Sequence, residues 1–169
     1  MKRRLSLLVA LSGAALLATG CAGLGGAPRV ATDSGAPREA WNGRLSLQVA
    51  STPPQSFAAL FELHGSAQAG ELVLTSPIGS TLGILRWSPG RASLLNGRDT
   101  REFDSIAALS EAATGAAIPI EALFGWLQGR DVAVPGWRAN LEQVADGRLQ
   151  ATRQSPQPTA ELRVIFDTP

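Results

Sequence analysis

The chain has 169 residues, 44% of them hydrophobic, and a formal net charge of +1. This length and composition predict one folded domain with a sizeable core and exclude a disordered chain. Three of the 15 basic residues lie in the first four positions, and the chain after residue 20 has 12 basic and 14 acidic side chains, which excludes the basic surface that nucleic-acid binding requires.

The N-terminus has the pattern of a secretory signal. Residues 1–4 are basic at three positions, residues 5–17 form an apolar stretch, and small residues follow. The stretch is too short, and too interrupted by Ser12 and Gly13, to predict a membrane-spanning helix. Residues 1–20 are therefore predicted to be a signal peptide.

Cys21 is the only cysteine, which excludes a disulfide within the chain and a zinc site built from several cysteines. The sequence from Leu17 to Cys21 resembles a bacterial lipobox, whose cysteine is acylated and becomes the first residue of the mature protein. The alternative is a free structural cysteine after an ordinary signal peptide. Residues 21–40 are then expected to be the lipidated cysteine and a flexible tether, with a reach of roughly 25 Å.

Six strands are predicted next, because apolar and polar residues alternate with period two. They cover residues 41–49, 57–63, 71–75, 82–87, 91–95 and 98–103. Leu72 and Leu74 are expected to share one face with Leu82 and Ile84 across the turn between them. Asn96-Gly97 is a strong hairpin signal, and the short connections predict an antiparallel meander.

The turn Ser76-Pro77-Ile78-Gly79 places an apolar residue between proline and glycine. Ile78 either folds back onto the sheet or forms an exposed apolar finger that touches lipid or a partner. The residues leave both interpretations open.

The period changes after residue 103. Asp104 or Ser105 can cap a short helix that Gly115 ends, and a second helix is predicted from Pro119 to Gly129. One apolar stripe in the second helix contains Ile120, Leu123, Phe124 and Leu127, with Trp126 beside it.

Three more strands follow at residues 137–141, 147–154 and 160–167. The predicted fold is mainly β with α: a curled antiparallel sheet whose concave face is plugged by the helices. Such a sheet either fills its interior with side chains or encloses an apolar ligand.

Nothing in the sequence predicts an enzyme, a cofactor site or a metal site. His64, the only histidine, has no nucleophile or acid at the spacing of a catalytic triad, and Glu62 beside it supplies only a second possible metal ligand. A phosphate-binding loop and a Gly-x-Ser-x-Gly elbow are both missing from the sequence.

Several motifs in order resemble the outer-membrane lipoprotein receptor family LolB. These are the lipobox with Cys21, Trp41-Asn42-Gly43-Arg44, the stretch Leu72-x-Leu74-Thr75-Ser76-Pro77-Ile78-Gly79-Ser80-Thr81, and Gly115-x-x-Ile118-Pro119-Ile120-x-x-Leu123-x-x-Trp126-Leu127-x-Gly129. The resemblance implies an incomplete barrel with a helical lid over an apolar cavity. It also implies that Cys21 is anchored in the outer membrane and that the domain at residues 41–169 faces the periplasm. By the family's sorting rule, Ala at position 22 in place of Asp directs the lipoprotein to the outer membrane.

The resemblance further implies a function without catalysis. A monomeric receptor would accept lipoprotein acyl chains from a periplasmic carrier, LolA, and insert the lipoproteins into the inner leaflet of the outer membrane. The turn Ser76, Pro77, Ile78 and Gly79 would contact the membrane, and the expected cavity residues are Leu45, Leu47, Phe57, Phe61, Leu72, Leu82, Leu123, Phe124 and Trp126. The alternatives are a lipocalin-like lipoprotein that binds a small apolar ligand and a structural envelope lipoprotein with a filled core.

Overall fold

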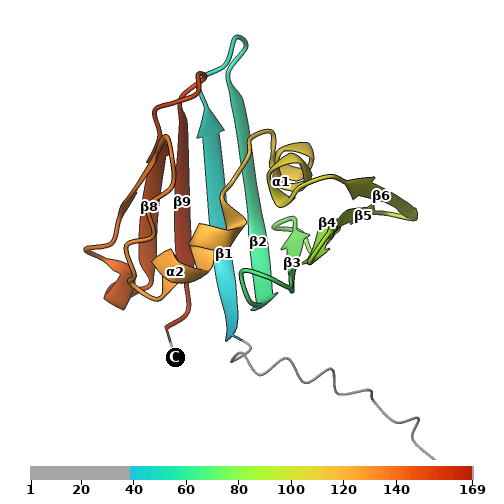
Figure 1. Cartoon of the computed structure of the whole chain (residues 1–169), viewed down its shortest axis with the longest axis horizontal. Coiled ribbons are helices and arrows are strands. Elements are labelled where there is room, and N and C mark those ends of the chain that lie inside the picture. Colours follow the sequence, from blue (N-terminus) through green and yellow to red (C-terminus); the bar gives the residue numbers. More distant parts are fainter. Residues whose placement is uncertain (1–38, 169) are drawn as a thin grey trace, which may run out of the picture. The chain divides into compact units, whose positions relative to one another are not determined.

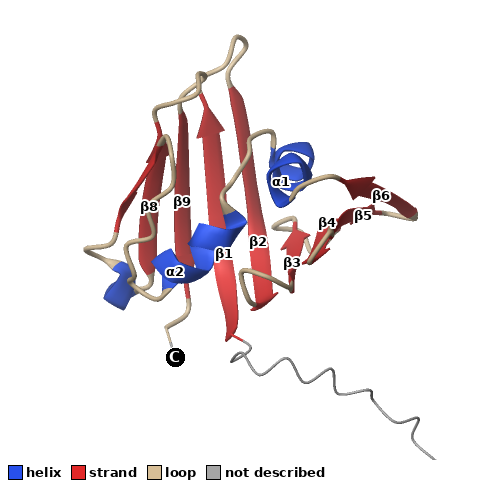
Figure 2. Cartoon of the chain, in the orientation of Figure 1, coloured by secondary structure: helices blue, strands red, loops and turns tan. Residues whose placement is uncertain are grey.

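The computed structural model describes residues 39–168, so the predicted signal peptide, Cys21 and nearly all of the predicted tether lie outside the described residues. The described chain folds into one antiparallel sheet with two helices on one of its faces (Figures 1 and 2). The strands are β1 (Glu39–Val49), β2 (Gln55–Gly65), β3 (Gly70–Thr75), β4 (Thr81–Ser88), β5 (Arg91–Asn96), β6 (Asp99–Phe103), β7 (Trp137–Asn140), β8 (Arg148–Arg153) and β9 (Ala160–Phe166).

The nine strands are ordered β6-β5-β4-β3-β2-β1-β9-β8-β7, and the two end strands do not pair with each other. The sheet is therefore curled but not closed, which confirms the predicted incomplete barrel. Its centre is the pairing of β1 with β2 on one side and β9 on the other, through residue pairs such as Leu45↔Ala59 and Leu45↔Val164. In these central strands alternate residues are buried, as the period-two pattern predicts.

The first helix, α1 (Ile106–Thr114), has both predicted caps. The Ser105 Oγ accepts a hydrogen bond from the Ala108 N–H at 3.1 Å. Gly115 has φ +88° and donates its N–H to the Glu111 carbonyl, a conformation that glycine adopts without strain.

The second helix, α2 (Ile120–Leu127), lies across the concave face in front of β1 (Figure 1). Every residue of α2 is buried except Glu121. A single apolar stripe does not explain this burial. Residues 130–134 cover the other side of the helix: the Trp126 Nε1 donates to the Val132 carbonyl at 2.9 Å, and a Cβ at Gly125 would lie 2.2 Å from the Val132 Cγ2.

The strand β4 is present as predicted, but the prediction of its interior face is wrong. The pairing of β3 with β4 shifts register between Leu74 and Thr75: Leu74 pairs with Gly83, Thr75 pairs with Thr81, and Leu82 is skipped. The interior face of β4 therefore carries Gly83, Leu85 and Trp87, whereas Ile84 is half-buried on the other face. Leu82 is exposed on that outer face, so its assignment to the cavity is incorrect.

A 3₁₀ turn, η1 (Val144–Asp146), precedes β8. Within residues 39–168 no helix is both long and apolar enough to cross a membrane.

Candidate functional site

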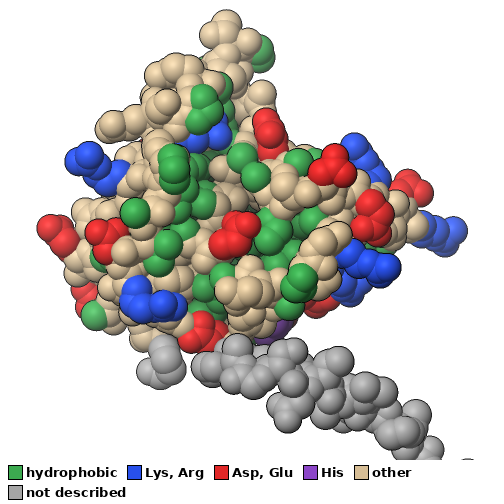
Figure 3. Space-filling view, viewed as in Figure 1, with side chains coloured by type: hydrophobic (Ala, Val, Ile, Leu, Met, Phe, Trp, Pro, Cys, Tyr) green, Lys and Arg blue, Asp and Glu red, His purple; other side chains and the backbone are tan. Residues whose placement is uncertain are grey.

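The interior of the curled sheet is apolar and is filled by the helices. The structure brings most of the expected cavity residues together in one buried cluster: Leu45, Leu47, Phe61, Leu72, Leu123, Phe124 and Trp126. Phe57 is half-buried and packs against the same cluster. Figure 3 shows hydrophobic side chains gathered across the middle of the face that carries the helices. These residues thus form a packed interior in this structure.

Aromatic rings attach α2 to the sheet. The Phe124 ring lies edge-on to Trp41 of β1 and to Trp87 of β4, with centroid distances of 5.5 Å and 6.1 Å. The Trp87 Nε1 donates to the Ser66 carbonyl at 3.1 Å, which fixes its ring against the β2–β3 connection. Trp87 and Leu85 were missed as interior residues because Leu82 and Ile84 offered an equally apolar alternation in the same strand.

A second aromatic pair continues along the interior. The ring centroids of Trp126 in α2 and Trp137 in β7 are 6.4 Å apart. The Arg153 guanidinium lies over the Trp137 ring, 5.9 Å from its centroid. The Arg153 side chain is buried and its Nη2 donates to the Pro158 carbonyl at 3.0 Å. This arginine therefore joins the β8–β9 connection to the wall of the interior.

An apolar cleft opens at the end of the sheet where β1 begins and α2 ends. Its volume is about 730 Å³, within the range of ligand sites. It is lined by Glu39, Ala40, Trp41, Leu127, Gln128, Gly129, Leu141, Glu142, Val144, Ala145, Phe166 and Thr168. Since Trp41 also packs against Phe124, this cleft borders the packed interior.

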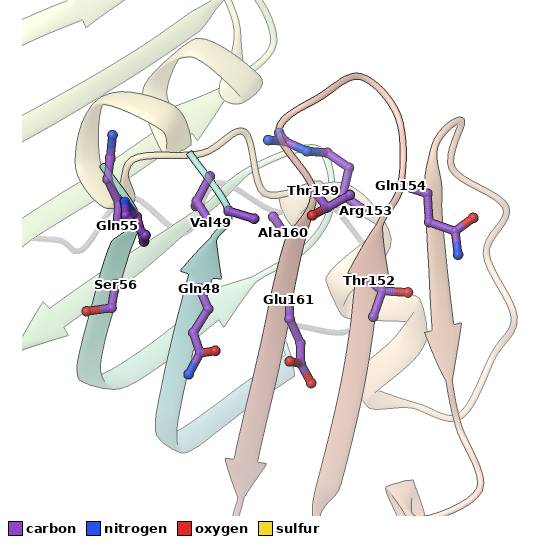
Figure 4. Close-up of a pocket in the computed structure, with 12 residues that line it drawn as sticks. Gln48, Val49, Gln55, Ser56, Thr152, Arg153, Gln154, Thr159, Ala160 and Glu161 are labelled. Carbon is purple, nitrogen blue, oxygen red and sulfur yellow. The ribbon is translucent and has the colours of Figure 1, made fainter. Parts of the chain in front are cut away.

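A second cleft, of about 530 Å³, lies at the opposite end of the same strands (Figure 4). Polar residues, including Gln48, Gln55, Thr152, Arg153 and Glu161, outnumber the apolar ones in its lining, although most of its exposed surface is apolar. None of the expected cavity residues lines it, which distinguishes this cleft from the apolar interior.

The turn between β3 and β4 presents Ile78 to solvent. The Gly79 N–H donates to the Ser76 carbonyl at 2.9 Å, and the Ser80 N–H donates to the Ser76 Oγ at 3.0 Å. These bonds close the loop on itself and leave the Ile78 side chain 90% exposed, so it does not fold back onto the sheet. The exposed finger is the geometry that the structure supports.

The remaining titratable candidates do not assemble a catalytic or metal site. The His64 Nε2 lies 3.8 Å from a Glu62 carboxylate oxygen, and both side chains are more than half exposed on the outer face of β2. Among residues 39–168 no group of three or more His, Cys, Asp or Glu side chains is placed to hold a metal ion.

A family model described as "Outer membrane lipoprotein LolB" matches residues 39–165. An outer-membrane lipoprotein LolB of Bordetella petrii is 31% identical over 138 residues, which cover 81% of this chain and 68% of the relative. One from Cupriavidus necator is 29% identical over 157 residues, covering 92% and 79%. A match to the protein of Cupriavidus metallidurans is 38% identical over 85 residues and spans 50% of this chain and 41% of that relative.

Proposed function

The chain belongs to the LolB family of outer-membrane lipoproteins, and we propose that it is a receptor that takes lipoproteins from a LolA-like periplasmic carrier and inserts them into the outer membrane. The observation that supports this most directly is the division of apolar surface. One set of apolar side chains is gathered inside the curled sheet under α2, and a separate apolar residue, Ile78, is held in solvent. The first set suits acyl chains and the second suits a bilayer.

Acyl chains enter by replacing α2 on the concave face. The apolar wall made by Leu45, Leu47 and Leu72 then stays covered, because an acyl chain is as apolar as the side chains it displaces. The unfavourable part is the exposure of the apolar side chains of α2 to water, which lowers the net affinity for cargo. The 730 Å³ cleft beside Trp41 and Leu127 is the entrance to this interface.

The direction of transfer follows from differences in affinity. A receptor without a nucleotide can move cargo only from a carrier that binds it less tightly, and release it only to a bilayer that binds it more tightly. The packed interior fits this requirement, since an acyl chain must compete with Leu123, Phe124 and Trp126 for the same wall. In the proposed state the acylated Cys21 holds the monomeric domain on the periplasmic side of the outer membrane.

A handover experiment tests the proposal. A lipoprotein loaded on LolA is mixed with this protein, and the cargo bound to each is measured after separation. We expect stoichiometric movement of cargo to this protein and then to liposomes. A lipocalin-like ligand binder and a structural lipoprotein both predict that the cargo stays on LolA, and that result would falsify the receptor assignment.

A further inference from the structure

The large apolar side chains that are exposed in residues 39–168 lie along one row across the sheet and in the turn at the end of that row. They are Leu60, Ile78, Leu82 and Ile165, with exposed fractions of 39%, 90%, 37% and 48%. Residue pairs connect them across five strands: Ile165 pairs with Arg44, Arg44 with Leu60, Leu60 with Thr75, and Thr75 with Thr81. The last pair, Thr75 with Thr81, closes the turn that carries Ile78, and Leu82 is the next residue after Thr81. We name Ile165, Arg44, Leu60, Leu82 and Ile78 the outer band.

The sheet part of the band lies on the face opposite the helices. Directly paired residues of an antiparallel sheet point to the same face. The neighbours of Arg44, Leu60 and Ile165 along their strands are Leu45, Phe61 and Val164, and these are buried in the interior. Four interstrand steps of about 4.8 Å make the row from Ile165 to Thr81 roughly 19 Å long.

The band also carries positive charge. Arg44 lies between Leu60 and Ile165, and Arg148 pairs with Ile165 at the end of the row. Both arginines are exposed, the row contains no acidic residue, and neither arginine forms an ion pair within residues 39–168. A hollow of about 430 Å³ is lined by Arg44, Leu60 and Thr75 of this row and also by the acidic Glu62 beside it.

We propose that the outer band lies on the surface of an anionic phospholipid bilayer. Isoleucine and leucine side chains enter the boundary between headgroups and acyl chains, while guanidinium groups bind the lipid phosphates beside them. This inference rests on the proposed function, in which Ile78 touches the same bilayer. The band is continuous with the Ile78 turn, because Thr75 and Thr81 at the base of that turn belong to its row.

The position of the tether agrees with this surface. The predicted lipid anchor at Cys21 precedes β1 by a segment with a reach of roughly 25 Å, and Arg44 lies on that first strand. Contact along the whole band fixes the tilt of the domain, whereas contact at Ile78 alone would leave the domain free to pivot. The interior then keeps a constant orientation toward the membrane that receives the cargo.

The test uses the full acylated chain in proteoliposomes, with a fluorophore on a cysteine introduced at Ile165→Cys. A chain with Glu121→Cys is the matched control, because Glu121 is exposed on α2 at the opposite face. Cys21, the only native cysteine, is acylated under the proposal, so the chain without an introduced cysteine should take no label. Brominated lipids report contact with the bilayer, and iodide reports contact with water.

In liposomes of phosphatidylcholine and phosphatidylglycerol, we expect brominated lipids to quench the Ile165 probe more strongly than the Glu121 probe, with a matching loss of iodide quenching. Phosphatidylcholine alone, or the double substitution Arg44→Gln and Arg148→Gln, should reduce this difference. Equal iodide quenching of the two probes in anionic liposomes overturns the inference. Protection of Ile165 only after the carrier is added also overturns it, and makes the band a protein interface.

Cargo handover is measured in the same proteoliposomes, so the two ideas fail separately. If transfer is normal but the Ile165 probe stays exposed to water, membrane contact of the outer band is refuted and the receptor function stands. If transfer fails but the Ile165 probe contacts lipid, the receptor function is refuted and membrane contact of the outer band stands.

Discussion

Phe124 of α2 stands edge-on to Trp41 of β1, with ring centroids 5.5 Å apart and an interplanar angle of 74°. This pair packs the helix against the sheet, and Trp87 of β4 lies edge-on to the same ring at 6.1 Å. The aromatic contact is therefore part of the core and, under the proposed function, the contact that incoming acyl chains displace.

Removing the ring should separate these two roles. Phe124→Ala deletes both edge-on contacts and leaves a cavity, so we expect the free energy of unfolding to fall by about 3–5 kcal/mol. Glu121→Ala on the exposed side of the same helix is the control and should change it by less than about 0.5 kcal/mol. Urea unfolding followed by tryptophan fluorescence measures both, and similar values for the two variants would contradict the packing described here.

The milder Phe124→Leu tests ligand binding in a folded protein. We expect the smaller side chain to loosen α2 and to raise the affinity for a fluorescent fatty acid, because under the proposed function the acyl chain competes with α2 for one wall. Phe124→Asp places a charge on the face of α2 that packs on this wall, so it should favour displacement of the helix and raise the affinity further. Titrations paired with melting curves separate binding from stability, and unchanged binding in both folded variants would place the acyl site elsewhere.

Gly125 is required by the segment that covers α2. A Cβ there would lie 2.2 Å from the Val132 Cγ2, so Gly125→Ala must push residues 130–134 outward, at a cost of about 1–3 kcal/mol. Val132→Ala in the same chain removes the clashing methyl groups and should restore part of that loss. The unfolding free energies of the single and double variants form a cycle, and simple additivity would show that the two residues do not meet.

Ser110 on α1 holds the connection between α1 and α2 through buried hydrogen bonds. Its Oγ accepts from the Ile118 N–H at 3.0 Å and lies 3.1 Å from the Ile118 carbonyl. Ser110→Ala leaves that N–H without its partner, and we expect a loss of about 1–3 kcal/mol. Ser105→Ala, which removes the N-cap of the same helix, should cost about 1 kcal/mol. Thermal unfolding gives the order of the two variants, and a smaller loss at Ser110 would refute this ranking.

Ile78→Glu should separate stability from delivery. Because the side chain is 90% exposed, we expect a change in unfolding free energy within about 0.5 kcal/mol. The carboxylate opposes entry of the turn into a bilayer, so the variant should accept cargo from LolA but fail to pass it to liposomes. Thr100→Glu on the edge strand β6 is the control for added charge. Delivery at the normal rate by the folded Ile78 variant would remove the turn from the mechanism.

The local pattern of residues was enough to predict the nine strands, the two α-helices and a curled antiparallel sheet. The family resemblance supplied the incomplete barrel, and the 3₁₀ turn η1 was not predicted. Apolar side chains recur every 2 residues in a strand and about every 3.6 residues in a helix, and turn residues such as Asn96-Gly97 mark the connections. The same pattern, together with the motifs from Trp41 to Gly129, indicated the LolB family. The residues expected inside the sheet were correct wherever a strand had only one apolar alternation, as at Leu45 and Leu47.

Only the tertiary structure decided which face of β4 is interior, because Leu82 with Ile84 and Leu85 with Trp87 are equally apolar choices. The register shift at Leu74 and Thr75 selects the second pair, and that shift depends on pairing between strands and not on either strand alone. The exposure of Ile78 could not be predicted for a similar reason, because the residues of the turn do not show how it closes. In the structure the Ser76 carbonyl and Oγ accept hydrogen bonds from Gly79 and Ser80, and the closed turn keeps Ile78 away from the sheet. The outer band, likewise, exists only because pairing across five strands brings Ile165, Arg44 and Leu60 into one row.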